Sequence, residues 1–281
     1  LTRSSAASDV YKRQMFGLPD KISSYFSKEM TYLNPDPVDI LSKPMSFDVK
    51  LKNGKYEKFI NDQFEIQQGI LTSSKWRSLN TSKNFNMNVS GLIEYDGMMD
   101  IKIKLIANND ISLNDISFLI SMEKDASKYM LGLGRKGGKL TKNINWNWDI
   151  SKHQEGLWLG NVNGGLQFVL RDNNYERPLN TNFYQSKPLK LPKSWYNESK
   201  GGINISLGKD EVSIVNFSND RFMKKGDSLD FNLRFLITPF KLINTEEHFN
   251  TRFVHKFVPI DSVQKLNGTV VNVHHANKIN P

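Results

Sequence analysis

Apolar and polar residues alternate along most of the chain, and this pattern predicts β-strands. Within 100–106, apolar side chains at every second position share one face, and Lys102 and Lys104 occupy the other. A strand with one dry and one wet face is typical of antiparallel sheets. The same pattern marks 46–52, 85–93, 111–122, 157–162, 166–171, 203–207, 212–217 and 229–237.

Short turn sequences separate these segments. Asn53-Gly54, Asp96-Gly97, Asn163-Gly164-Gly165 and Gly208-Lys209-Asp210 each stand between two of them. Such residues tolerate the positive φ angles of tight hairpins. Many short strands at regular spacing predict an all-β protein built as a large antiparallel β-sandwich.

One segment near the start has helical periodicity. Ile22, Tyr25, Phe26 and Met30 fall at i, i+3, i+4 and i+8. These spacings place the four side chains on one helix face, so the pattern predicts a brief helix within 19–30.

The C-terminal segment has a different pattern. In 268–275, four apolar or β-branched residues follow one another without alternation. Such a run suits a strand that is buried on both faces, as in parallel sheets. A parallel strand needs a partner and a crossover of a dozen or more residues. We therefore expect 15–257 to form the sandwich and 258–281 to hold the first strand of a second domain, which the chain truncates.

The first fourteen residues have an unusual reading at the DNA level. The segment 4–14, SSAASDVYKRQ, can be back-translated into the adapter that transposase-based library kits attach to DNA fragments. We therefore expect 1–14 to be a sequencing-adapter scar, and we exclude these residues from the fold. On this interpretation the native N-terminus, with any signal peptide, is missing.

Composition excludes several classes of function. The formal net charge is +9, but the basic residues are interleaved with acidic ones, and no run of like charges indicates a nucleic-acid partner. The chain has no cysteine, which excludes disulfides and thiol-bound metals. No apolar run approaches the 18 residues of a membrane span. We expect no cofactor and no resident metal.

Residues 132–137, GLGRKG, formally match the G-x-G-x-x-G pattern of dinucleotide-binding proteins. That function requires a helix directly after the glycines, because the helix N-terminus holds the pyrophosphate. The sequence that follows is rich in asparagine and tryptophan and forms a poor helix. We therefore expect a glycine-rich loop between two strands.

Three tryptophans are candidates for sugar contact. Alternation places Trp146 and Trp148 on one face, and Trp158 follows nearby. Exposed indole rings can stack on the apolar C–H faces of sugars, whereas buried rings fill a core. The sequence leaves both alternatives open. The adjacent carboxylates Asp210-Glu211 lie at a predicted hairpin tip, which favours solvated turn residues over an acid/base pair.

Histidines gather near the C-terminus. His274 and His275 point to opposite faces of the predicted parallel strand, so they are poorly placed to chelate one metal ion. At the C-terminal end of a barrel strand, however, His274, His275 and Asn277 would lie at the mouth of an active site. We expect these three residues to contact substrate.

Six phrases, taken together, resemble the N-terminal β-sandwich region of glycoside hydrolase family 123-like bacterial proteins. They are YMLGLG (129–134) followed by GG (137–138), WNWD (146–149), LWLGNVNGGL (157–166), LITPFK (236–241), NTRFVHK (250–256) and VNVHHANKINP (271–281). The resemblance covers 16–281 and rests on the order and spacing of the phrases.

The resemblance implies a sandwich followed by a catalytic (β/α)8 barrel that hydrolyses glycans, with 258–281 as the truncated start of that barrel and its first strand. It implies substrate-assisted removal of β-linked N-acetylgalactosamine or a related 2-acetamido sugar, in which the acetamido oxygen attacks the anomeric carbon. An Asp-Glu pair on the barrel would serve this reaction. The pair would lie beyond Pro281, so we expect the chain itself to be inactive.

The partners implied are a glycan substrate and the chain's own downstream barrel, and the implied location is the periplasm, the cell surface or the medium of a bacterium. Arg252 and His255 would contribute to the junction with the barrel. The alternative is a non-catalytic carbohydrate-binding or adhesion module that uses Trp146, Trp148 and Trp158 as a stacking platform.

Overall fold

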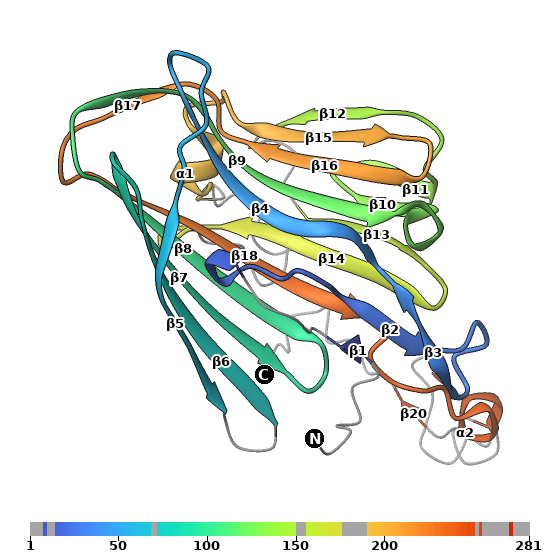
Figure 1. The fold of residues 1–281 in the computed structure, drawn as a ribbon. Helices are drawn as coiled ribbons and strands as arrows, with labels where there is room; N and C mark the ends of the chain where they lie inside the picture. The colour runs from blue at the N-terminus through green and yellow to red at the C-terminus, as the bar shows by residue number, and fades with distance from the viewer. Residues whose placement is uncertain are drawn as a thin grey trace, which may run out of the picture. The chain divides into compact units, whose positions relative to one another are not determined.

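The computed structural model describes residues 8–9, 15–68, 72–149, 156–175, 190–250, 253–254 and 270–271. The chain divides into two compact units, Leu1–Lys241 and Leu242–Pro281. The described strands of the first unit form antiparallel ladders, which confirms the all-β class (Figure 1).

The largest sheet of the first unit has nine strands in the order β11-β10-β13-β14-β18-β8-β7-β6-β5. Adjacent strands in the chain form hairpins in its two halves, and β18 joins the halves by pairing with both β14 and β8. The strands are β5 (Ile60–Gln68), β6 (Ser73–Thr81), β7 (Phe85–Glu94), β8 (Met98–Ala107), β10 (Tyr129–Gly132), β11 (Arg135–Lys139), β13 (Leu157–Asn161), β14 (Gly164–Arg171) and β18 (Ser228–Thr238).

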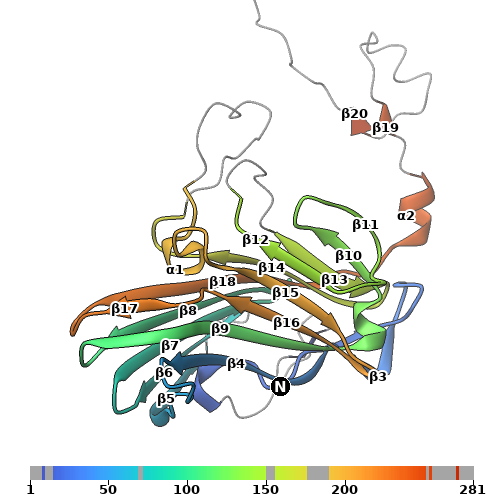
Figure 2. The ribbon, with the colours of Figure 1, turned by 90° about the horizontal axis from the view of Figure 1, so that it is seen from above.

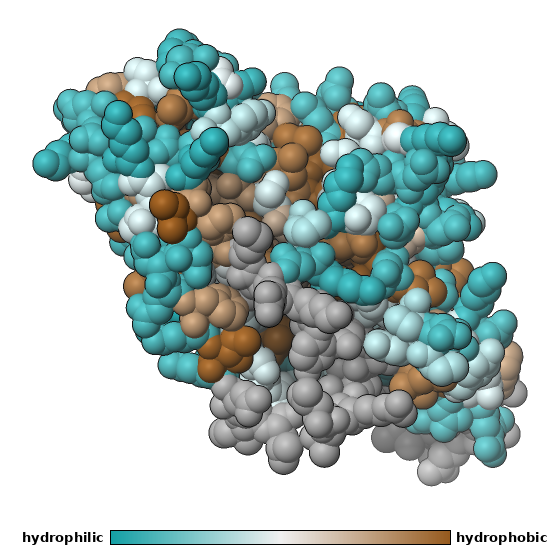
Figure 3. Space-filling view, in the orientation of Figure 1, coloured by the Kyte–Doolittle hydropathy of each residue, from teal (hydrophilic) through white to brown (hydrophobic). Residues whose placement is uncertain are grey.

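A six-stranded sheet forms the second layer, in the order β12-β15-β16-β9-β17 with β4 also paired to β9. Its strands are β4 (Leu41–Leu51), β9 (Ile111–Glu123), β12 (Ile144–Asn147), β15 (Gly202–Leu207), β16 (Glu211–Phe217) and β17 (Arg221–Met223). On the side shown in Figure 3, hydrophilic side chains predominate over β9, β15 and β16, with a smaller apolar group among them.

The two sheets share one hydrophobic core. Aromatic rings meet across the layers, with Phe47 of β4 5.3 Å from Phe231 of β18 and Phe118 of β9 6.3 Å from Phe235 of β18. These contacts make the two sheets a sandwich, as the alternating pattern predicted.

The predicted faces of the strands are confirmed in β8. Its Ile101, Ile103 and Leu105 are fully buried, whereas Lys102 and Lys104 are exposed. The lysines lie on the side of the nine-stranded sheet that is turned away from the core, and we call this side the open face. Figure 2 shows the layers from above.

The predicted helix within 19–30 is wrong. The segment contains a strand, β2 (Ser23–Phe26), which pairs with β3 (Leu33–Asp39) and with β1 (Ser8–Asp9) in a separate three-stranded sheet. The apolar positions are nevertheless correct, because Ile22 and Phe26 are both buried.

Serine chemistry explains the extended backbone of β2. Serine hydroxyls compete for the hydrogen bonds of a helix, and a helix of this length is marginal by itself. Here Ser23 donates to the Asp39 carboxylate at 2.7 Å and Ser24 donates to the carbonyl of Asn163 at 2.5 Å. These long-range partners, together with the β3 ladder, stabilise the strand.

The glycine-rich segment 132–137 lies in a hairpin between β10 and β11, as predicted. Gly132, Leu133 and Gly134 all have positive φ angles at this turn. No helix follows the glycines among the described residues of this region, so the segment lacks the helix N-terminus of a dinucleotide site.

The remaining short elements of the first unit are η1 (Met15–Gly17), η2 (Lys124–Ser127) and α1 (Lys193–Tyr196). No helix in the described part of the chain is long and apolar enough to cross a lipid bilayer.

The second unit contains α2 (Thr245–Asn250), β19 (Phe253–Val254) and β20 (Val270–Val271). β20 pairs with β19 in the parallel direction, with Phe253 opposite Val270. This is the direction that the uninterrupted apolar run predicted. The predicted boundary at residues 257–258 lies outside the described residues, and the barrel itself stays a prediction.

Candidate functional site

Two of the three candidate tryptophans are buried. Trp146 is 7% exposed and Trp148 is 5% exposed. Their rings pack edge to face with centroids 5.1 Å apart. Trp146 lies on β12, Trp148 directly follows that strand, and both rings belong to the hydrophobic core, as the packing alternative expects.

Trp158 instead lies half-buried on the open face of the nine-stranded sheet, on β13. Its indole covers Gly160, where an added Cβ would lie 2.1 Å from the ring atom Cζ2. The Nε1–H group donates to the hydroxyl of Thr238 on β18 at 2.9 Å. The ring is therefore held flat on a floor of glycine backbone that includes Gly165 of β14, which pairs with Gly160.

An ion pair and a shallow depression lie further along the open face. The Arg234 guanidinium donates to both carboxylate oxygens of Asp100, at 2.7 and 2.8 Å. Hydrogen bonding to Asp100 raises the pKa of Arg234 above its ordinary value. The two side chains line a depression of about 230 Å³ together with Leu92, Glu94 and Met98. Bidentate pairs hold both groups in a defined orientation.

The adjacent carboxylates Asp210 and Glu211 lie at a hairpin tip, as predicted. Glu211 accepts hydrogen bonds from Lys43 at 2.7 Å and from Ser42 at 3.1 Å. The Lys43 contact lowers the pKa of Glu211. A carboxylate with a lowered pKa stays ionised at neutral pH, so Glu211 is unsuited to act as a general acid.

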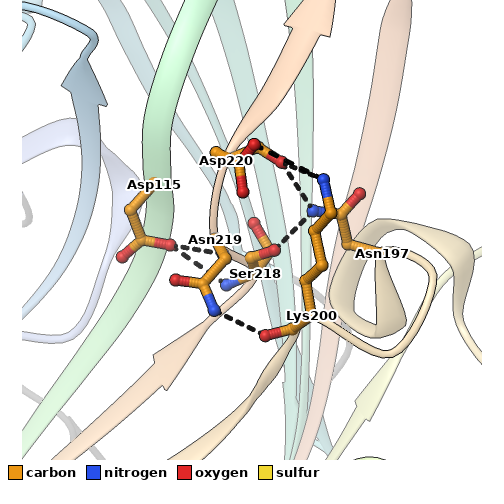
Figure 4. Close-up of polar contacts among 6 residues, drawn as sticks. All are labelled: Asp115, Asn197, Lys200, Ser218, Asn219 and Asp220. Carbon is orange, nitrogen blue, oxygen red and sulfur yellow. Dashed lines mark hydrogen bonds and ion pairs between the residues drawn. The ribbon is translucent and has the colours of Figure 1, made fainter.

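A polar cluster near the end of β16, shown in Figure 4, contains the backbone turn of Ser218 and Asn219. Asp115 of β9 accepts hydrogen bonds from both backbone N–H groups, at 3.2 and 2.7 Å. Asn219 has a φ angle of 60°, so the carboxylate stabilises a turn in the left-handed region.

The other half of this cluster binds the segment that follows α1. Asn197 donates to the carbonyls of Ser218 and Asp220, at 2.6 and 3.1 Å. Lys200 Nζ lies 3.4 Å from the Asp220 carboxylate, and Asn219 donates to the Lys200 carbonyl at 2.6 Å. Three consecutive residues, 197–199, have positive φ angles. These bonds offset that strain. We interpret the cluster as a structural feature that holds the segment after α1 against the turn at 218–220.

A half-buried arginine beside the cluster was missed by the sequence analysis. Arg221 of β17 donates to the carbonyl of Ser194 at 2.5 Å and lies over the Phe231 ring at 5.8 Å. Burial lowers its pKa to about 10, against the attraction of Asp115 and Glu198. No alternation signal marks β17, because only three residues form it.

Asp48 on β4 lowers the free energy of unfolding in a pH-dependent way. Burial raises its pKa, the nearby Asp115 carboxylate adds to the rise, and a hydrogen bond from Ser46 opposes it. A carboxyl whose pKa is higher in the folded state binds more protons there than in the unfolded chain. The free energy of unfolding therefore falls as pH rises from the ordinary value of 3.8 through the raised one.

We expect Asp48→Asn to remove this destabilisation by the ionised carboxylate. The variant should gain stability relative to the parent chain at pH 7 and lose that gain at pH 3, where the parent carboxyl is protonated. Urea unfolding at the two pH values measures the difference. The exposed Asp62→Asn is the matched control, and an equal effect of Asp48→Asn at both pH values would contradict the assignment.

The remaining candidates lie outside the described residues. They are Arg252, His255, His274, His275 and Asn277. Their contact with substrate or with a barrel stays a prediction. Among the described residues, no group of three or more His, Asp or Glu side chains is placed to hold a metal ion.

Comparison with known proteins gives one family. The family model described as glycoside hydrolase 123, third domain, matches residues 8–239. The match begins within the segment 1–14, whose origin as a scar stays a prediction. No curated protein matches the chain.

Several solved structures are similar at low identity. A galactose mutarotase related enzyme from Lactobacillus acidophilus has a TM-score of 0.45 at 7% identity, over 80% of this chain and 93% of that one. The Slr1438 protein from Synechocystis sp. PCC 6803 has a TM-score of 0.39 at 9% identity, over 81% and 99%. A heparinase III has a TM-score of 0.38 at 9% identity, over 80% and 30%.

Proposed function

The chain belongs to the glycoside hydrolase 123 third-domain family, and we propose on this basis that it is the β-sandwich part of a bacterial glycoside hydrolase. The observation that carries the proposal is the match over residues 8–239, which includes nearly all of the sandwich. In the parent enzyme the sandwich supports a catalytic (β/α)8 barrel that follows it.

The substrate we propose is a glycan that ends in a β-linked 2-acetamido sugar, such as N-acetylgalactosamine. The acetamido oxygen would attack the anomeric carbon, with a barrel Asp orienting it and a barrel Glu acting as acid and base. The adjacent Asp210-Glu211 pair of the sandwich does not compete for this role, because Glu211 is paired with Lys43 at a hairpin tip and is unsuited to donate a proton.

A binding module built on three stacked tryptophans is less well supported. Trp146 and Trp148 are core residues, which leaves Trp158 as the one member of that set on the open face. Two of the three rings that the binding-module alternative needs for stacking are therefore buried in the core.

The test compares the 281-residue chain with the same chain extended along its gene beyond Pro281. We expect the extended protein to release nitrophenol from the 4-nitrophenyl β-glycoside of N-acetylgalactosamine or of N-acetylglucosamine. The 281-residue chain should release none. Hydrolysis by the shorter chain, or inactivity of a folded extended protein on both glycosides, would overturn the proposal.

A further inference from the structure

The surface around Trp158 combines a fixed aromatic ring with exposed apolar neighbours. Leu131 pairs with Trp158 and Tyr129 pairs with Gly160 in the β10–β13 ladder. Leu131 is 54% exposed and Tyr129 is 44% exposed. Because cross-strand partners share a face, these side chains flank the indole on the open face.

A second tryptophan shows what the same arrangement does inside the protein. Trp76 also covers a glycine, Gly91, where an added Cβ would lie 1.9 Å from the ring. Trp76 faces the core, is 5% exposed, and donates its Nε1–H to the carbonyl of Gly17 at 2.9 Å. The flat ring of Trp76 fills the core, whereas the ring of Trp158 lies over its glycine on the open face.

The one polar group of the Trp158 side chain already has a hydrogen-bond partner within the protein. Its Nε1–H group donates to Thr238, so the remaining ring surface offers apolar contact in a fixed orientation. The axial C–H groups of a pyranose form a flat apolar patch of matching shape, and its hydroxyls need polar partners at the rim.

Polar partners lie beside the ring on the open face. Gln167 of β14 pairs with Trp158 and is exposed. Leu236 pairs with Gln167 on one side and with Met98 on the other, so the ladder leads from Trp158 to the depression with Asp100 and Arg234. Three interstrand spacings separate Trp158 from Met98, about 14 Å. This length exceeds one pyranose ring and suits a short oligosaccharide.

We propose that this surface, formed by Trp158, Tyr129, Leu131 and Gln167, binds a pyranose ring of a neutral oligosaccharide by stacking on the Trp158 indole. The adjacent Asp100–Arg234 depression then binds hydroxyl groups of a neighbouring sugar. The proposal rests on the proposed function for the class of glycan.

Binding to the 281-residue chain tests this directly. The probes are the methyl β-glycosides of N-acetylgalactosamine, N-acetylglucosamine and galactose, measured by saturation-transfer NMR and calorimetry, with glycerol as a polyol lacking a ring. We expect binding of at least one pyranoside and none of glycerol. Trp158→Ala should weaken this binding at least about tenfold, a loss of about 1.4 kcal/mol.

Two further variants separate stacking from stability. Gly160→Ala keeps the tryptophan but lifts the ring from its floor, so it should also weaken binding, whereas Trp158→Phe should retain part of it. Leu79→Ala is the matched control, because Leu79 is 42% exposed on the open face of β6, away from Trp158. Circular dichroism confirms that each variant is folded.

The outcomes distinguish this inference from the proposed function. Undiminished binding in folded Trp158→Ala or Gly160→Ala, or no binding of any pyranoside by the parent chain, overturns the Trp158 surface. If the extended protein still hydrolyses its glycoside in that case, the proposed function stands. If the surface binds pyranosides while the extended protein is inactive, only the proposed function fails.

Discussion

Replacing Trp195 by alanine is expected to lower the free energy of unfolding by about 3–5 kcal/mol. Trp195 of α1 is fully buried and packs edge to face on Phe231, with ring centroids 4.8 Å apart. Its Nε1–H donates to the carbonyl of Arg171 at 3.1 Å. The truncation therefore leaves a large cavity and removes the partner of that carbonyl. Urea unfolding followed by circular dichroism measures the change.

Two controls test whether burial of Trp195 causes the loss. Trp195→Phe keeps most of the apolar volume and should cost less, about 1–3 kcal/mol for the lost hydrogen bond. Phe222→Ala removes an aromatic ring that is 57% exposed on β17 and should have little effect. A loss below about 1 kcal/mol for Trp195→Ala would show that the site collapses to fill the cavity.

Replacing Gly132 by alanine is expected to destabilise the chain by about 1–3 kcal/mol. Gly132 has a φ angle of +115°, in a region that side chains rarely adopt. An added Cβ would also lie 2.0 Å from the carbonyl oxygen of Gly156. Because that oxygen belongs to the backbone residue directly before β13, it cannot move without disturbing the β10–β13 ladder.

Gly138 in the same hairpin is the matched control. It also has a positive φ angle, +152°, but an added Cβ there meets no atom within 4 Å. Gly138→Ala therefore carries backbone strain without the clash, and we expect a smaller loss in thermal and urea unfolding. Equal losses for the two substitutions would show that strain by itself accounts for the effect at Gly132.

Much of the sandwich could be predicted because alternation reports directly on burial. In β8 and β18, and in β9 from Ile116 to Met122, every second residue faces the core, and the predicted segments agree with these strands to within a few residues. Turn residues placed the hairpins β7–β8, β13–β14 and β15–β16 equally well. These features are local, since they depend on the two faces of a pleated strand and on the φ angles of a turn.

The segment 19–30 shows where local periodicity misleads. Its apolar spacing suits a helix face, and the burial of Ile22 and Phe26 is correct. The backbone is nevertheless extended, because its hydrogen bonds go to β3 and its serine hydroxyls reach Asp39 and Asn163. These partners are distant in the chain, so a short window of sequence carries no trace of them.

The tryptophans were equally ambiguous, and tertiary contacts separate them. Trp146 and Trp148 face the core from an edge strand, whereas Trp158 lies over Gly160 and Gly165 on the open face. The glycines are visible in the sequence, but which side of the sheet they line depends on the pairing of β13 with β14 and β10.

The amino-acid sequence by itself determined the all-β class, the positions of many longer strands and the buried side of those strands. It did so because alternating polarity and turn chemistry act over a few residues. The tertiary structure decided which strands pair, how β18 joins the two halves of the large sheet, and which of three tryptophans reaches the surface. It also paired β17 with β9, strands that are distant in the chain, so that Asp115 of β9 acts electrostatically on Arg221 of β17. These outcomes depend on contacts between remote segments, which become favourable when the two sheets close over their common core.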